Sequence, residues 1–142
     1  MVDKLIDILV SETPLSIDQC YGFILDEQGG GNCLFVGTTR NKNKGEEVTH
    51  LNFDAYDGMA MKEMEKIAQH CIDNLSALKV AIHHRKGHVG IGEIAVIIAV
   101  SSIHRDASFE ACRYAIDTLK NRVPIWKKEH LTDGSYWVNA TP

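Results

Sequence analysis

The sequence of 142 residues has no apolar run long enough to span a membrane. A transmembrane helix needs about 20 consecutive apolar residues, whereas the longest apolar run here, from Ile94 to Val100, has the length of a strand. The first ten residues contain acidic side chains and no small-residue cleavage site, so a secretory signal is not expected. These absences predict a cytoplasmic protein that does not bind membranes.

Cysteines are few, and they do not form a pattern. No C-x-x-C pair occurs, and the spacing is not that of a disulfide framework. The simplest interpretation is that they are buried thiols in a reducing cytosol, and no motif supports a nucleophilic cysteine. The four cysteines are Cys20, Cys33, Cys71 and Cys112.

Motifs for common cofactors and metals are also missing. The sequence contains no P-loop, no G-x-S-x-G and no H-E-x-x-H, and the glycines between residues 87 and 92 do not open a helix as a dinucleotide fingerprint would. His83 and His84 are adjacent in a predicted strand, so they point to opposite faces and cannot easily share a metal with His88. We therefore expect neither a cofactor nor a metal site.

Apolar residues follow strand periodicity and helix periodicity in turn along the chain. The most apolar segment, Glu93–Ser101, is expected at the centre of a sheet. Val48–Tyr56 alternates and is expected to pair with the strand before it, while the polar loop Asn41–Gly45 is expected to be mobile. The expected strands are Lys4–Val10, Asn32–Val36, Val48–Tyr56, Leu78–His84, Glu93–Ser101, Val123–Glu129 and Ser135–Val138. The expected helices are Ile17–Tyr21, Gly58–Leu75 and a third that ends near Arg122, before Pro124.

This order of elements predicts an α+β fold. Hairpins mixed with helices favour helices packed on a largely antiparallel sheet. At 142 residues the chain is expected to form a single domain over residues 1–142.

The third helix has two faces of different character. Phe109, Cys112, Ile116 and Leu119 fall at helical spacing and, with Ala111 and Ala115 between them, predict a core-facing stripe. Asp106 is a candidate for capping the helix start. The opposite face is charged. It is either a solvated face with weak ion pairs, or a face whose lysine points into a pocket. The charged residues are Glu110, Arg113, Asp117 and Lys120.

Positive charge is concentrated in one segment. Residues 101–128 carry six Lys/Arg and three Asp/Glu, a local charge of +3, in a chain whose net charge is −4. A basic segment in an acidic protein predicts that an anion binds there.

Cationic side chains also follow two predicted strands. Arg40 follows one strand, and His104 and Arg105 follow another. If these strands are neighbours that run the same way, the three side chains meet at one sheet edge, where Lys120 and Lys127 could join them. Several cations around one cleft would lower the pKa of a lysine, which could then act as a base, an acid or a nucleophile. The arginines could hold a phosphate.

Four motifs give the chain a family resemblance over nearly its whole length. It resembles the large, catalytic subunit of molybdopterin synthase, and the last motif is long and unusual. The motifs are residues 35–41 (FVGTTRN); Asp54-Ala55-Tyr56 with Met59-Ala60; His84-Arg85-x-Gly87; and residues 99–105 (AVSSIHR) continuing to residues 114–120 (YAIDTLK) and 123–129 (VPIWKKE).

This resemblance implies an α/β-hammerhead-type fold that forms a homodimer. Each copy would bind a small ubiquitin-like sulfur carrier ending in Gly-Gly, which gives a heterotetramer. The implied activity is a sulfurtransferase of molybdenum cofactor biosynthesis. It moves sulfur from the carrier's thiocarboxylate to cyclic pyranopterin monophosphate (precursor Z) and forms the dithiolene of molybdopterin. Lys120 and Lys127 match the lysines that the family regards as catalytic. The family's substrate-binding residues carry over as Thr38, Thr39, Arg40, His104, Arg105, Lys120, Lys127, Lys128 and Glu129.

Two other functions are compatible with a cationic pocket. One is a phosphate-ester hydrolase or transferase that needs no carrier. The other is a regulatory module that binds an anionic metabolite or nucleic acid without catalysis. The net charge of −4 and the pI near 5.9 argue against nucleic acid, because phosphate-backbone binders usually present a broad basic face.

Overall fold

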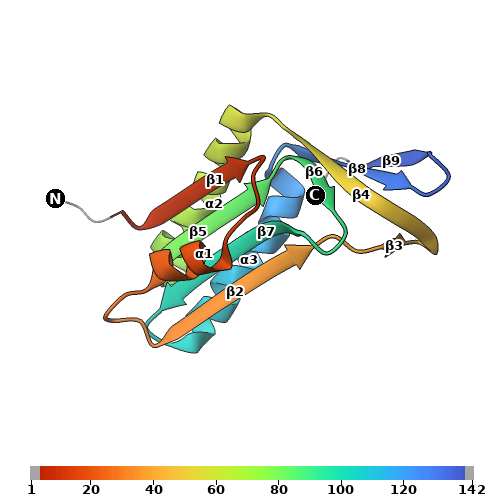
Figure 1. Ribbon diagram of the computed structural model, residues 1–142. Coiled ribbons are helices and arrows are strands. Elements are labelled where there is room, and N and C mark those ends of the chain that lie inside the picture. Colours follow the sequence, from red (N-terminus) through yellow and green to blue (C-terminus); the bar gives the residue numbers. More distant parts are fainter. Residues whose placement is uncertain (1–3, 140–142) are drawn as a thin grey trace.

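The computed structural model describes residues 4–139, which form two β-sheets and three helices (Figure 1). The single domain expected over residues 1–142 stays a prediction, and residues 1–3 and 140–142 lie outside the described residues. The strands are β1 (Ile6–Ser11), β2 (Gly31–Thr38), β3 (Lys42–Asn43), β4 (Glu46–Ala55), β5 (Ala77–Arg85), β6 (Gly87–Gly90), β7 (Ile94–Ser102), β8 (Ile125–Leu131) and β9 (Tyr136–Asn139). The helices are α1 (Ile17–Ile24), α2 (Asp57–Asn74) and α3 (Arg105–Arg122).

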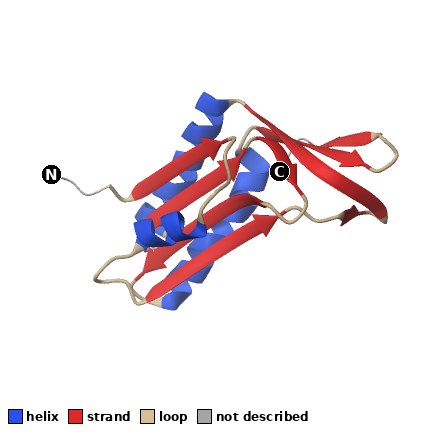
Figure 2. Cartoon of the chain, in the orientation of Figure 1, coloured by secondary structure: helices blue, strands red, loops and turns tan. Residues whose placement is uncertain are grey.

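The first sheet carries all three helices. Its strand order is β1-β5-β7-β2, in which β1 and β5 are parallel and the other pairs are antiparallel. Helices α2 and α3 cover one face, and the short α1 covers the other (Figures 1 and 2). The predicted α+β fold with a largely antiparallel sheet is therefore confirmed. Within residues 4–139, no helix has both the length and the apolar composition that crossing a bilayer requires.

Strand β7 lies at the centre because its two faces belong to two cores. Val96 and Ile98 pack in the cluster that includes α2 and α3, whereas Ile97 and Ala99 pack against α1. Successive side chains of a strand point to opposite faces, so a strand buried on both faces has no polar alternation. The apolar run therefore predicted the central strand correctly.

The second sheet extends to one side of the first (Figure 1). Its order is β3-β4-β8-β9, and β6 pairs with part of the other edge of β4. The prediction that β4 pairs with the strand before the Asn41–Gly45 loop is wrong, because β2 belongs to the first sheet. Alternation identifies a half-buried strand, but it does not identify the strand's partner.

The segment Asn41–Gly45, expected to be mobile, forms the short strand β3 and a tight turn. Lys44 and Gly45 have φ values of 54° and 81°, and β3 pairs with the first residues of β4. Two consecutive residues with positive φ suit the two-residue hairpin turns that match strand twist. The sequence did not predict this turn, because Lys44 is not a typical residue for positive φ.

Helix α3 ends at Arg122, as Pro124 predicted, but its inner face is rotated relative to the prediction. Phe109 is 59% exposed, and the buried position beside it is Ser108. The Ser108 hydroxyl donates to the carbonyl of Gly31 at 2.8 Å, so a small polar residue stands where the helix closely approaches β2. Asp106 does not cap the helix, because it lies within the first turn. The remaining buried residues of α3 are Ala111, Cys112, Ala115 and Leu119.

Candidate active site

Helix α3 runs back along the strand that precedes it. Near its start, Ser108 bonds to Gly31, which pairs with Ser102 at the end of β7. Further along, the Cys112 thiol lies 3.8 Å from the carbonyl oxygen of Ile98, in the middle of β7. The last turn of α3 therefore lies at the end of the sheet where β7 begins and β2 ends. We call this end the junction end, because the chain enters the second sheet there.

The residues after β2 are fixed by the loop between β6 and β7. The amide of Thr39 donates to the carbonyl of Glu93 at 3.1 Å, and the amide of Gly92 donates to the carbonyl of Thr39 at 2.9 Å. Thr39 is 4% exposed, and its hydroxyl has no hydrogen-bond partner within residues 4–139. Arg40, the next residue, is exposed at the junction end. The backbone on both sides of Thr39 is thus held in place while the Arg40 side chain stays accessible.

Three residues of β8 form a charged group on the second sheet. Lys127 Nζ lies 3.5 Å from Oε1 of Glu129. The side-chain amide of Asn43 donates from Nδ2 to Oε2 of the same carboxylate at 2.6 Å. Glu129 is 4% exposed, so these partners satisfy a buried charge that would otherwise be costly. Nζ of Lys128, the next residue of the strand, lies 3.7 Å from the centre of the Tyr136 ring. The carboxylate of Glu129 therefore positions the ammonium group of Lys127.

A cavity of about 500 Å³ lies beside these lysines. Its volume is within the usual range for small-molecule sites. Sequence reasoning found Lys127 and Lys128 but missed Lys86, because Lys86 occupies the variable position of the His84-Arg85-x-Gly87 motif. The lining residues are Glu12, Asn52, Phe53, Asp54, Ala55, Lys86, Gly87, Trp126, Lys127, Lys128 and Val138.

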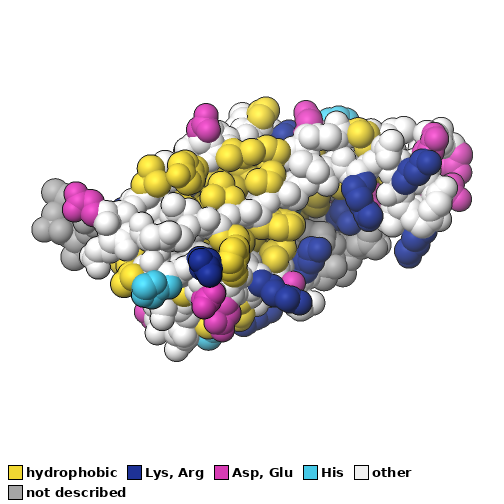
Figure 3. All heavy atoms as spheres, turned by 90° about the horizontal axis from the view of Figure 1, so that it is seen from below, with side chains coloured by type: hydrophobic (Ala, Val, Ile, Leu, Met, Phe, Trp, Pro, Cys, Tyr) yellow, Lys and Arg dark blue, Asp and Glu magenta, His cyan; other side chains and the backbone are white. Residues whose placement is uncertain are grey.

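Lys120 and Arg40 lie at the same end of the molecule, but neither is among the described residues that line this cavity. Lys120 is exposed in the last turn of α3, where a cation interacts favourably with the helix dipole. Lysine and arginine side chains are numerous on the side of the second sheet, at the right of Figure 3. The junction end thus collects cations from β8, α3 and the segment after β2.

His104 and Arg105 lie elsewhere. They line a separate hollow of about 530 Å³ with Gly30, Ile103 and Asp106. Because β2 and β7 are antiparallel, the residues after β7 lie at the opposite end of the sheet from the residues after β2. The prediction that all these cations share one cleft within a single chain is therefore wrong.

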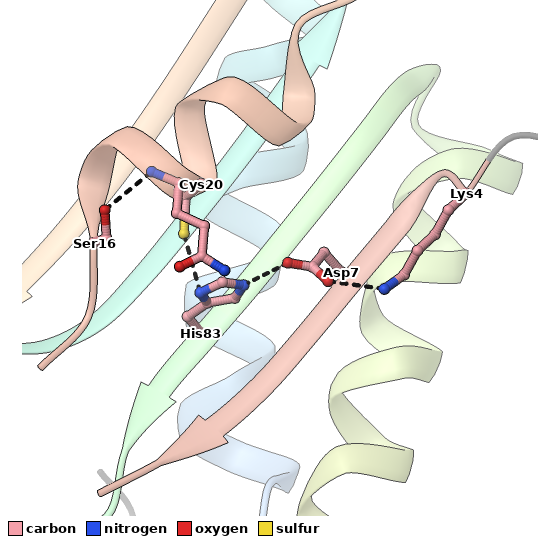
Figure 4. A network of polar contacts seen from close by, with 6 residues as sticks. Lys4, Asp7, Ser16, Cys20 and His83 are labelled. Carbon is pink, nitrogen blue, oxygen red and sulfur yellow. Dashed lines mark hydrogen bonds and ion pairs between the residues drawn. The ribbon is translucent and has the colours of Figure 1, made fainter. Parts of the chain in front are cut away.

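Another polar cluster lies between α1 and the first sheet (Figure 4). Sγ of Cys20 is 3.3 Å from Nδ1 of His83, and Nε2 of His83 is 2.8 Å from Oδ2 of Asp7. Burial raises the pKa of the Cys20 thiol to about 11, and Asp7 adds to this effect. Cys20 and His83 are at most 1% exposed, so this arrangement supports packing rather than nucleophilic catalysis. Cys71 and Cys112 are also buried, as predicted, and Cys33 is half-buried.

Comparison with known proteins decides the family. The profile of the MoaE protein family matches residues 10–122. The chain belongs to the MoaE protein family. It is 44% identical over 130 residues to the molybdopterin synthase catalytic subunit of Dictyostelium discoideum, covering 90% of this chain and 82% of the relative. It is 42% identical over 129 residues to the same subunit of Halalkalibacterium halodurans, covering 91% and 83%.

Two solved structures share the fold of this chain. The crystal structure of molybdopterin synthase from Staphylococcus aureus matches with a TM-score of 0.85 and 34% identity, covering 97% of this chain and 98% of that one. A complex of subunits 1 and 2 of molybdopterin-converting factor from Helicobacter pylori matches in fold, with a TM-score of 0.72, 23% identity and coverage of 92% and 87%. Membership of this family supports an enzymatic role in molybdenum cofactor synthesis.

Proposed function

We propose that the chain catalyses sulfur transfer from the thiocarboxylated tail of a small ubiquitin-like carrier to cyclic pyranopterin monophosphate. Two sulfur atoms are added to form a dithiolene. Each carrier's sulfur bonds to a substrate carbon, and water then hydrolyses the resulting thioester, so that the sulfur stays on the substrate and the carrier leaves with a C-terminal carboxylate. The observation that carries the proposal is the placement of Lys127, which the family resemblance marks as catalytic, beside a cavity of small-molecule size.

The lysines have different roles in this proposal. Lys120 lies against the carbonyl carbon of the carrier tail and either activates it or bonds to it transiently. In the second case the lysine nitrogen displaces the sulfur that the substrate has taken up, and water then hydrolyses the amide and frees the lysine. Lys127 donates a proton or stabilises negative charge as the carrier's sulfur attacks the substrate. The contact with Glu129 keeps Lys127 Nζ in one place, which favours such a role because its position is set before the ligand binds. Arg40, which follows the fixed backbone of Thr39, contacts the anionic ligand.

The carrier and a second copy of the chain are the proposed partners. The Helicobacter pylori protein of the same fold is described in complex with another subunit. If His104 and Arg105 contact the same substrate as Lys127, they must act on the site of the second copy, since they lie at the opposite end of their own chain. A homodimer with one carrier per copy, a heterotetramer, meets this requirement.

The test is reconstitution with a thiocarboxylated carrier and the cyclic substrate, followed by detection of the dithiolene product. Lys120→Ala is expected to abolish turnover while carrier binding, measured by calorimetry, stays within about twofold of the wild type. The matched control is Lys62→Ala, which removes an exposed lysine of α2 and should leave turnover unchanged. Near-normal turnover of Lys120→Ala would exclude Lys120 from the mechanism.

The same experiment separates the two alternatives. A carrier-independent hydrolase or transferase acting on a phosphate ester would react with the substrate alone. A regulatory module would bind it and release it unchanged. Family membership favours sulfur transfer over both.

A further inference from the structure

Lys86 lines the same cavity as Lys127, but it has no role in the mechanism described so far. We propose that Lys86 is a cationic contact for the phosphate group of the substrate. This inference rests on the proposed function, because it assigns one more residue to the same site.

The backbone holds Lys86 next to the strands that form the cavity. Its amide donates to the carbonyl of Ser11 at 2.9 Å, which ties it to the end of β1. Gly87 follows with a φ of 79°, a value that favours glycine, and the chain turns there into β6. In the register of the second sheet, Gly87 lies opposite Phe53, and Phe53 lies opposite Lys127. Lys86 and Lys127 therefore approach the cavity from positions separated by one strand.

The side chain of Lys86 is already positioned but retains free donors. Its Nζ donates to Oδ2 of Asp57 at 2.5 Å, at the start of α2. A lysine ammonium has three N–H groups, so two remain for a ligand while the contact with Asp57 persists. The hydrogen bond to Asp57 raises the pKa of Lys86. Burial opposes this change, and the charges of Asp57 and Glu12 add to it. Lys86 therefore remains a cation over the range of pH in which an enzyme assay is run.

Lys86 determines the sign of the charge in the cavity. Two of the lining residues, Glu12 and Asp54, are acidic, and they balance Lys127 and Lys128. Lys86 changes the formal sum for the lining residues from zero to +1. A phosphate offers several acceptor oxygens that separate lysines can share, and lysine is a common phosphate ligand. Its charge therefore favours entry of a phosphate over an uncharged ligand.

The first test is Lys86→Met, which keeps the length of the side chain and removes its charge. The matched control is Lys66→Met, because Lys66 also forms an ion pair, with Glu63 at 3.1 Å, but lies on α2 away from the cavity. In the reconstituted enzyme, Lys86→Met is expected to raise KM for the cyclic substrate about tenfold with kcat within about twofold, since a charge-assisted contact is lost equally from the ground and transition states. Lys86→Arg should recover most of the affinity, and Lys66→Met should behave as the wild type.

The second test does not depend on turnover. Inorganic pyrophosphate is titrated into the chain alone, and the indole resonance of Trp126, which lines the cavity, reports binding. Lys86→Met should weaken this binding about tenfold, with Lys66→Met again as the control. Unchanged KM and unchanged pyrophosphate affinity in Lys86→Met would overturn the proposal. If Lys86→Met instead weakens only the binding of the carrier, Lys86 contacts the carrier tail and the proposal is also wrong. If the wild type binds pyrophosphate through Lys86 but makes no dithiolene, the proposed function fails and the anion contact stands.

Discussion

At the scale of single residues, His84 shows how the second sheet packs on the first. It is 1% exposed, and the centre of its ring lies 5.0 Å from the centre of the Phe53 ring in an edge-to-face arrangement. Its Nδ1 lies 2.7 Å from the carbonyl oxygen of Arg85. Burial lowers the pKa of His84 to about 4, although the bond to Arg85 opposes this change. His84 is therefore neutral in the folded protein at pH values where it is protonated in the unfolded chain.

This difference predicts a loss of stability in mild acid. Because the folded pKa is below the unfolded value of 6.5, the contribution of His84 is complete above pH 6.5 and is lost as the pH falls toward 4. The loss should reach about 3 kcal/mol in the free energy of unfolding. Urea unfolding at pH 7 and pH 4.5 measures it. The difference between the two pH values should shrink in His84→Gln and persist in His70→Gln, whose side chain is partly exposed on α2. If the free energy of unfolding changes by the same amount between the two pH values in both variants, the assignment to His84 is wrong.

At the scale of elements, the sequence predicted those features that depend on local chemistry. The central position of β7 followed from its apolar run, and the end of α3 followed from Pro124. The partner of β4 did not follow, because pairing depends on contacts far apart in the sequence. The predicted meeting of Arg40 with His104 assumed neighbouring strands that run the same way, whereas the largely antiparallel sheet places them at opposite ends.

The β3–β4 hairpin has a consequence for the site. Asn43 on β3 donates to the buried carboxylate of Glu129, which in turn positions Lys127. Asn43→Ala is expected to lower the free energy of unfolding by about 1–3 kcal/mol, because a buried carboxylate loses a donor. It should also reduce turnover, because Lys127 is held less firmly. Urea unfolding and the sulfur-transfer assay measure the two effects, with the exposed neighbour Lys42→Ala as the control. If both variants behave alike, the hairpin does not support the site.

At the scale of the whole molecule, the chain presents two cationic regions at opposite ends. Lys127 lies beside one cavity, and Arg105 lines the other. A closed dimer in which each copy contributes one region to its partner would contain two equivalent composite sites.

This arrangement predicts complementation between two inactive variants. Lys127→Ala and Arg105→Ala should each be nearly inactive alone, whereas an equal mixture that exchanges subunits should recover about a quarter of wild-type activity, because half of the dimers then contain one intact site. Sulfur transfer measured before and after mixing tests this. A mixture of Lys127→Ala with Lys120→Ala is the control, because both residues lie at the junction end and no intact site can form. Recovery in neither mixture would mean that each chain uses only its own residues.

The cluster of Cys20, His83 and Asp7 makes one cysteine a reporter of motion. The thiol of Cys20 is fully covered while α1 rests on the first sheet, and His83 and Asp7 link it to β5 and β1. An alkylating reagent can reach this sulfur only when α1 separates from the sheet. The rate of alkylation at Cys20 therefore measures how often these local openings occur. The half-buried Cys33, on β2, should be alkylated without waiting for them. The two rates together would thus report how often the α1 layer detaches while the rest of the molecule stays folded.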